Sequence, residues 1–253
     1  EIMPSLVGSE MCIRDSCEII EFSRVLDMRG AFVGKRILLK DSKGRETLVE
    51  GLRFVSRNNV HRMGVKLYMT PLNYSGIVEV ESIIDGSIIN FYDAPRFKVK
   101  HTYMTANEKL AEDGGYVEVA TREKHLHVGC GCRIEAYCDG KQILGNRMTS
   151  VFGEQNIEFG DIHVEEGKEV QIVKYVSMYS ERECPTYELH STIKKEIEGF
   201  VHTGFENELK LHEEVYHNMW ENADIKITGD DDLNRAVRFN IFHLMSTGNE
   251  HDD

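Results

Sequence analysis

The chain has 253 residues, a formal net charge of −13 at pH 7 and a sequence pI near 5.3. This acidic balance, without any stripe of clustered basic residues, argues against nucleic acid as a partner, because phosphate contacts need Lys and Arg. No apolar run reaches the ~18 residues of a membrane-spanning helix, and no secretory signal is recognisable, which argues against a membrane partner. Six cysteines are too few for a disulfide scaffold, so we expect a cytoplasmic protein.

The first sixteen residues, EIMPSLVGSEMCIRDS, show neither the helical nor the strand period. They closely resemble the translated read-through of a sequencing adapter, and a disordered native tail is the alternative. We therefore predict that residues 1–16 are a non-native artefact and leave them out of the fold prediction. On this interpretation the true N-terminus is missing.

Short runs of alternating apolar and polar residues, separated by polar turns, follow one another over residues 36–180. Leu48, Leu52 and Phe54 fall on one face of one such run, and residues 96–104 alternate as a further strand. Strands at this spacing, without amphipathic helices between them, predict a mostly β protein with an antiparallel β-sandwich. Alternation is typical of such sheets because one face is buried and the other is wet.

The pattern changes after Pro185. Residues 186–200 and 204–223 are long, charged and free of proline, which predicts a pair of helices. In the second segment four side chains recur at spacings of three and four and form one stripe: Leu209, His212, Tyr216 and Trp220. Trp220 could stack on a sugar, but its position on this stripe favours packing.

A further amphipathic helix begins near residue 230, where Asp230 or Asp231 can cap it. Its broad apolar face comprises Leu233, Ala236, Val237, Asn240, Ile241 and Leu244, widened by Phe239 and Phe242. Such a face needs a large partner surface, and the rest of the chain offers no obvious one. We therefore predict a β-sandwich over 17–184, a helical linker over 185–229, and the first helix of a truncated catalytic domain over 230–253.

One segment, HLHVGCGCRIEAYC, offers side chains of the kind that bind zinc: His125, His127, Cys130 and Cys132. If the segment is one strand, its side chains alternate, and the two histidines lie on the opposite face from the two cysteines. A free cysteine also behaves as a small buried apolar residue. The pattern therefore favours core packing over a metal site.

Other patterns have equally plain structural explanations. The acidic clusters GDDDLN and HDD suit a helix cap and a solvated chain end better than a pair of catalytic carboxylates. No glycine-rich nucleotide-binding motif occurs. Cys184 has no His or Asp partner at a recognisable spacing. The residues alone thus predict no catalytic, cofactor-binding or metal-binding side chain.

Three stretches resemble one known family. RVLDMRGAFVGKRILLKDSKGRETLVEGLRFVS and LYMTPLNYSGIVEVES are similar to the N-terminal sandwich of glycoside hydrolase family 65. MWENADIKITGDDDLNRAVRFNIFHLMST resembles that family's linker and the first helix of its (α/α)6 catalytic barrel. The resemblance runs from about residue 22 to residue 253 and implies a supersandwich of the galactose-mutarotase type. Gly30 departs from the pattern, because relatives often have a second basic residue there, and the family's opening strands should precede residue 22.

The family consists mostly of inverting disaccharide phosphorylases, and the ending FHLMSTGNEHDD is most similar to the kojibiose-type branch. The resemblance implies that the intact protein converts an α-linked glucobiose and phosphate to β-glucose 1-phosphate and glucose. It also implies a homodimer without a metal or organic cofactor. The general-acid glutamate and the phosphate-binding residues of the family lie in the barrel, so none is carried over and this chain alone is expected to be inactive. The alternatives are a carbohydrate-binding sandwich without catalysis and a family 65 hydrolase such as a trehalase.

Overall fold

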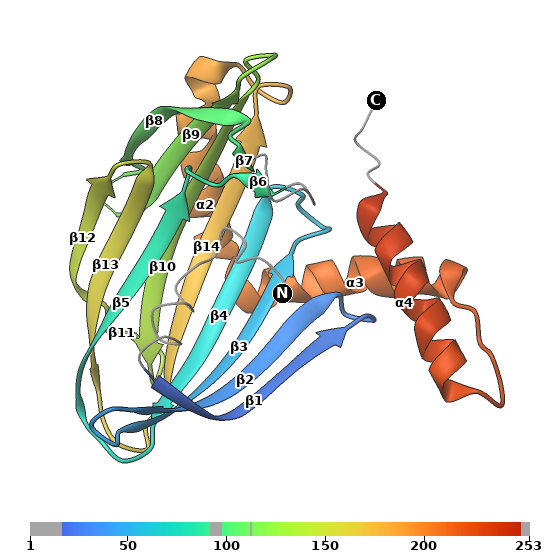
Figure 1. Ribbon diagram of the computed structural model, residues 1–253, viewed down its shortest axis with the longest axis horizontal. Coiled ribbons are helices and arrows are strands. Elements are labelled where there is room, and N and C mark those ends of the chain that lie inside the picture. Colours follow the sequence, from blue (N-terminus) through green and yellow to red (C-terminus); the bar gives the residue numbers. More distant parts are fainter. Residues whose placement is uncertain (1–16, 92–97, 112, 249–253) are drawn as a thin grey trace.

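A computed structural model describes residues 17–91, 98–111 and 113–248, and two antiparallel sheets make up most of this part of the chain (Figure 1). The large sheet contains, in spatial order, β1 (Cys17–Asp27), β2 (Phe32–Asp41), β3 (Glu46–Val55), β4 (Arg62–Pro71), β14 (Val170–Ser180), β10 (His127–Cys138), β9 (Gly115–Thr121) and β8 (Thr102–Lys109), with β11 (Lys141–Gln142) beside β10. The small sheet contains β12 (Gly145–Phe152), β13 (Gln155–Val164) and β5 (Gly76–Asp85), and β6 (Asn90–Phe91) pairs with β7 (Lys98–Val99). The predicted mostly β, antiparallel sandwich is confirmed.

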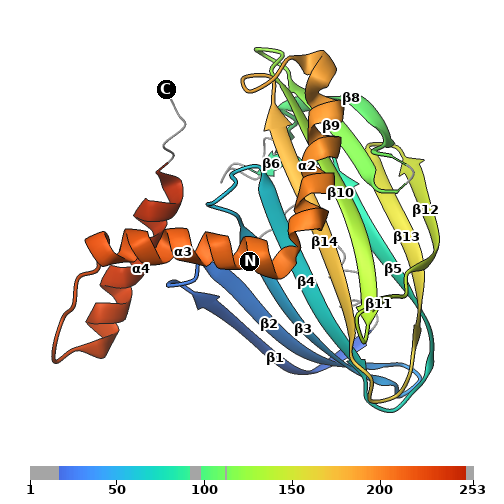
Figure 2. The same ribbon diagram turned by 180° about the vertical axis from the view of Figure 1, so that it is seen from behind.

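The C-terminal part of the described chain is helical. A short 3-10 helix, η1 (Thr186–Glu188), leads into α2 (Leu189–Thr203), α3 (Phe205–Ala223) and α4 (Asp231–Thr247). We call the face of the large sheet toward the small sheet its inner face; α2 and the start of α3 cover the opposite, outer face (Figure 2). The predicted helical pair is confirmed. None of the described helices has the length and hydropathy that a bilayer crossing requires.

Two cores result from this layering. Between the sheets, Ile84 of the small sheet packs with Cys132 and Val176 of the large one. On the outer face, Ile193 and Phe200 of α2 belong to a second core together with strand residues. Phe54 belongs to this outer core. Leu52 and Phe54 thus share one face of the strand, as predicted. This face is the outer one, so Phe54 packs beneath a helix and not between the sheets.

The last strand along the chain, β14, occupies the middle of the large sheet. It pairs with β4 on one side and with β10 on the other. It therefore joins the N-terminal strands β1–β4 to the strands β8–β10. Side chains alternate along a strand, so the neighbours Tyr175 and Val176 point to opposite faces, and both are buried: Val176 in the inner core and Tyr175 in the outer core.

Two glycines of β10 explain how closely α2 approaches the sheet. A Cβ atom built on Gly131 would lie 2.5 Å from Cγ2 of Ile193, and one on Gly129 would lie 2.8 Å from Cδ1 of the same residue. Both distances are shorter than carbon atoms tolerate. The GCG segment therefore makes room for the helix.

One strand was not predicted, and one strand prediction was wrong. The chain already forms a strand at β1, before the first predicted run, and its register with β2 shifts between Ile19 and Glu21. The predicted single strand at 96–104 is instead divided between β7 and β8, with Lys100 and His101 outside both. Residues 96 and 97 lie outside the described residues, as does the predicted artefact at 1–16.

We expect Gly131→Ala to lower the free energy of unfolding by roughly 1–3 kcal/mol, because the new methyl group overpacks the contact with Ile193. Chemical denaturation measures the effect. Gly34→Ala is the matched control, because a Cβ atom at that strand position meets nothing within 4 Å. In an Ile193→Ala background the cost of Gly131→Ala should shrink, and an unchanged cost would contradict the steric explanation.

Candidate functional site

The junction between the outer face of the large sheet and α3 holds the densest buried polar network of the described chain. The buried residues of α3 recur at spacings of three and four: Phe205, Glu208, His212, Tyr216 and Trp220. The predicted stripe is thus confirmed for His212, Tyr216 and Trp220, whereas Leu209 is only half-buried. Four of the five buried side chains carry a polar atom. The helix therefore docks largely through hydrogen bonds, which are directional.

Arg62 of β4 lies at the centre of this network. Its Nε donates to Glu196 of α2 at 2.6 Å, and its Nη1 donates to Glu208 of α3 at 2.7 Å. The guanidinium carbon also lies 5.3 Å from the centroid of the Phe200 ring. Burial lowers the pKa of Arg62, but the hydrogen bonds that it donates to Glu208 and Glu196, and the negative charge of these carboxylates, outweigh burial and raise that pKa above its ordinary value. One strand residue thus binds both helices.

The two carboxylates also accept hydrogen bonds from the loop between β3 and β4 and from β14. Glu208 is fully buried and also accepts a hydrogen bond from Oγ of Ser56 at 2.6 Å. Glu196 accepts from Nδ2 of Asn59 at 2.9 Å and from the hydroxyl of Tyr179 at 3.2 Å. A buried carboxylate is tolerated only when its charge is compensated in this way.

His212 connects α3 to two turns of the large sheet. Its Nδ1 accepts the backbone N–H of Arg57 at 3.0 Å, and its Nε2 donates to the carbonyl oxygen of Ala31 at 3.0 Å. A backbone N–H can only donate and a carbonyl can only accept, so the imidazole is neutral with its proton on Nε2. Burial lowers the pKa of His212, which favours the same neutral form.

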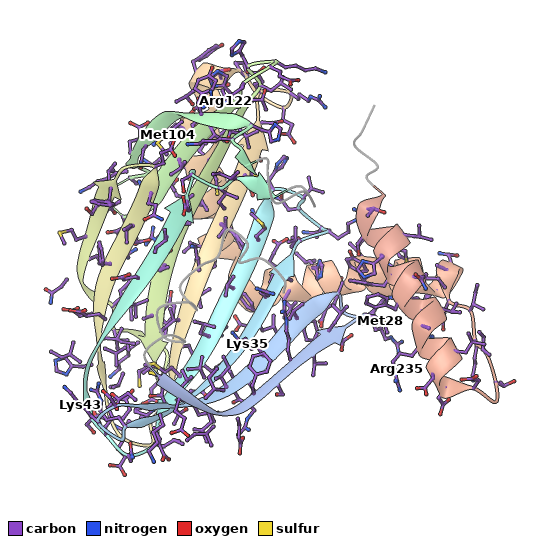
Figure 3. All side chains as sticks on the ribbon, in the orientation of Figure 1. Met28, Lys35, Lys43, Met104, Arg122 and Arg235 are labelled. Atoms are coloured by element: carbon purple, nitrogen blue, oxygen red, sulfur yellow. The ribbon has the colours of Figure 1, made fainter. Side chains whose placement is uncertain are left out.

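The turn between β1 and β2 provides the far end of the docking surface. Oδ1 of Asp27 accepts the N–H groups of Arg29 and Gly30 at 2.9 and 2.8 Å and so holds the turn. Nε1 of Trp220 donates to the carbonyl oxygen of Met28 at 2.7 Å. Met28 lies where β1 ends beside the helices (Figure 3). Trp220 is only 9% exposed, so the packing interpretation of this residue is confirmed.

Helix α4 crosses α3 and packs against it with only one side of its own surface. Phe242 is buried and packs with Tyr216 and Trp220. The side chain of Asp230 accepts the N–H of Leu233 at 2.9 Å, which confirms the predicted N-cap. The expectation that the chain offers this helix no surface was therefore wrong for the Phe242 side. The opposite side remains open, because Leu233 is 50% and Leu244 72% exposed.

Of the four candidate metal ligands, His127 lies on one face of β10 and Cys130 and Cys132 lie on the other, as predicted, whereas His125 precedes the strand. Nδ1 of His127 donates a hydrogen bond to the carboxylate of Glu118 at 2.7 Å, whereas Cys132 points into the core between the sheets. His125 precedes the strand and lies 3.1 Å from the hydroxyl of Tyr103. Burial raises the pKa of the Cys130 thiol to about 12, which disfavours the thiolate that a metal needs. Within the described residues no group of three or more His, Cys, Asp or Glu side chains could hold a metal ion.

The other sequence candidates are not brought together. Asp231 and Asp232 lie in the first turn of α4, where acids suit the helix dipole, and the HDD cluster lies outside the described residues. Cys184 is half-buried before η1, and burial raises the pKa of its thiol. No described candidate forms a catalytic constellation with another.

The sequence reasoning missed a second polar cluster, centred on Glu118 of β9. This carboxylate accepts hydrogen bonds from Thr105 at 2.8 Å and from the hydroxyl of Tyr116 at 2.7 Å, in addition to its contact with His127. Burial would raise the pKa of Glu118, but the hydrogen bonds from Tyr116, His127 and Thr105 hold it below its usual value. The glutamate within the apolar run GYVEVAT was the available signal.

We expect Arg62→Met to lower the free energy of unfolding by about 3–5 kcal/mol, because it leaves two carboxylates without their shared cation. Chemical denaturation measures the loss. Arg235→Met is the control, since its exposed pair with Asp232 should contribute less than about 1 kcal/mol. Equal effects of the two substitutions would show that burial of the Arg62 network does not matter.

The lowered pKa of His212 makes the junction sensitive to acid. Below the unfolded-state pKa of about 6.5 the unfolded chain binds the proton more readily, so the free energy of unfolding should fall as pH decreases from there. His212→Asn should flatten this part of the pH profile, because the amide oxygen can still accept from Arg57 N–H but cannot gain a proton. Denaturant melts between pH 7 and 5 test this, with the exposed His217→Asn as the control. An unchanged slope in His212→Asn would contradict the assignment.

Comparison with known proteins identifies the family. The kojibiose phosphorylase of Thermoanaerobacter brockii is 41% identical over 249 residues, which are 97% of this chain and 32% of that protein. The kojibiose phosphorylase of Caldanaerobacter subterraneus subsp. tengcongensis is 37% identical over 94% of the chain and 31% of its own length. An α,α-trehalose phosphorylase of T. brockii is 28% identical over 91% of the chain. The chain thus spans about a third of the length of these relatives.

The fold agrees with the same assignment. The solved structure of a candidate kojibiose phosphorylase from the human microbiome superposes with a TM-score of 0.78 over 90% of this chain and 29% of its own, at 13% identity. Residues 6–219, from the sandwich through α2 and into α3, match the model of the glycosyl hydrolase family 65 N-terminal domain. The chain therefore belongs to glycosyl hydrolase family 65, and most of it is that family's N-terminal domain.

Proposed function

We propose that this chain is the N-terminal part of an inverting disaccharide phosphorylase, which converts an α-linked glucobiose and phosphate to β-glucose 1-phosphate and glucose. The observation that carries the proposal is the 41% identity to the T. brockii kojibiose phosphorylase across nearly the whole chain. Because the match covers only 32% of that relative, the activity belongs to a longer protein.

In this proposal the chemistry takes place in the part of the protein that follows α4. One carboxylic acid protonates the glycosidic oxygen as the bond breaks. A phosphate oxygen attacks the anomeric carbon from the opposite face, so the configuration inverts and no second carboxylate has to activate water. The chain by itself is then inactive. Its contribution is a rigid support whose helices fix where the catalytic domain begins.

Helix α4 is the element through which we propose that this support acts. Phe242 fixes one side of α4 to α3. Arg238 of α4 also donates two hydrogen bonds, each of 2.7 Å, to the carboxylate of Asp224, which lies in the segment between α3 and α4. The other side presents Leu233 and Leu244. Helices that expose such a stripe bury it against another element. We propose that this element is the rest of a helical catalytic domain.

Three further properties belong to the same proposal. We propose that the intact protein is a homodimer, that it acts in the cytoplasm, and that inorganic phosphate is its co-substrate in place of any metal or organic cofactor. Four described cysteines, Cys130, Cys132, Cys138 and Cys184, carry free thiols, which favours a reducing compartment. A chemistry that needs only proton transfer and phosphate attack favours the absence of a cofactor.

The test is phosphorolysis by the full-length protein. We expect glucose 1-phosphate from one member of a panel of α-linked glucobioses, only when phosphate is present, and none from the 253-residue chain alone. The product is measured by a coupled phosphoglucomutase assay after conversion of the β anomer. Disaccharide cleavage that continues without phosphate would replace the proposal with a hydrolase. Product formation by the chain alone would refute its predicted inactivity.

A further inference from the structure

The part of the outer face that α2 and α3 leave uncovered carries an unusual row of side chains. In Figure 2, α2 covers the upper half of this face and α3 leads away from it, so that neither of these helices covers the lower half. Across this half, directly paired residues of neighbouring strands form what we call the tyrosine row: Gln142, Tyr137, Gln171, Tyr68, Glu50 and Arg36. Amide and aromatic side chains alternate over its first four members.

The spacing of the row is set by the sheet. Neighbouring strands lie about 4.8 Å apart, so the backbones at Tyr137 and Tyr68, two strands apart, are separated by roughly 10 Å. The amide of Gln171 lies between them on β14. Because β10 and β4 both run antiparallel to β14, they run parallel to each other, and the two tyrosines project from equivalent positions.

Each ring is held by the side chain two residues earlier on its own strand. The hydroxyl of Tyr137 donates to Glu135, which is buried. Nζ of Lys66, also buried, lies 5.0 Å from the centroid of the Tyr68 ring. The two rings are therefore positioned before any ligand binds, which lowers the entropic cost of binding. Both tyrosines remain partly exposed.

The charges around the row are compensated within the protein. Lys66 pairs with Glu206 of α3, and Glu135 pairs with Arg133 at 2.8 Å. At the other end of the row Arg36 pairs with Glu50 at 3.3 Å. The three described cations nearest to the row, Lys66, Arg133 and Arg36, are therefore each paired with a carboxylate, and the chain as a whole carries a net charge of −13. The row therefore suits a neutral ligand.

We propose that the tyrosine row is a binding site for a neutral oligosaccharide, specifically an α-linked glucan. The C–H groups on the face of a pyranose ring are attracted to the negative face of an aromatic ring. The side-chain amide of Gln171 supplies both a donor and an acceptor for adjacent hydroxyl groups. Two rings about 10 Å apart can each contact one sugar of the same short chain.

The position of this site does not depend on the proposed phosphorylase activity; only the choice of glucose as the sugar rests on it. The two ideas can fail separately. Glucan binding by the 253-residue chain is measured without catalysis, and phosphorolysis by the full-length protein is measured without reference to the tyrosine row.

Isothermal titration calorimetry of the 253-residue chain with a linear α-1,4-linked glucose heptamer tests the site. We expect one saturable site, and a Kd raised about tenfold or more in Tyr68→Ala and in Tyr137→Ala. Gln171→Ala should weaken binding by a smaller factor. A β-1,4-linked glucose hexamer should bind more weakly than the α-1,4-linked heptamer. Soluble starch should slow the migration of the chain in a native gel if the site also binds the polymer.

Tyr187→Ala is the matched control, because Tyr187 is a tyrosine that is 83% exposed and lies outside the row. It should bind the heptamer as the unmodified chain does. Thermal melts establish that each variant is folded, and Gln171→Ala and Tyr137→Phe replace Tyr137→Ala if that variant unfolds.

Absence of saturable binding by the unmodified chain would overturn the proposal. Equal losses in Tyr187→Ala and the row variants would overturn it as well, as would unchanged binding in folded Tyr68→Ala.

Discussion

The ion pairs of Arg62 with Glu196 and Glu208 are the contact on which the helical half of the structure depends. Arg62 belongs to the sheet, and its two partners belong to α2 and α3. Desolvating three charges is costly, so the network contributes less to stability than its short distances suggest. Its stronger effect is on specificity. If either helix slid along the sheet by one turn, a buried charge would lose its partner, and that penalty selects a single arrangement.

The same logic extends along α3. A helix that docks through leucines can slide or rotate at modest cost, because dispersion contacts are not directional. Here Glu208, His212 and Trp220 each need a particular partner atom on a strand end or turn. The helix therefore has one position relative to the sheet. Since α4 packs against the far end of α3, it inherits that position.

Much of this structure could be predicted from sequence periodicity. Alternation of apolar and polar residues identified many of the strands, and the helical stripe identified α3. The split of 96–104 into β7 and β8 was not readable, because an extended loop has the same period as a strand. The burial of Lys66 was not readable either, since a lysine in an alternating run usually lies on a wet face. Lys66 is buried because helices more than a hundred residues away cover it.

Some features of the candidate sites could likewise be predicted from the sequence, and others could not. The separation of His127 from Cys132 followed from the geometry of one strand and needed no tertiary information. The Arg62 network and the Glu118 cluster could not be found in this way, because each joins strands or helices that are distant in the sequence. The open row of Tyr137 and Tyr68 depends on strand order, since β14 must lie between β10 and β4 for the two rings to be neighbours.

The central place of β14 also bears on how the chain is made. Strands β1–β4 leave the ribosome long before β14, which is the only described strand that pairs with their edge at β4. The same holds for the edge of β10. An unpaired strand edge is a template for pairing with other chains, and contacts between distant segments form slowly. Folding during translation is therefore limited by one late strand, and two nascent half-sheets must be kept from other chains until it arrives.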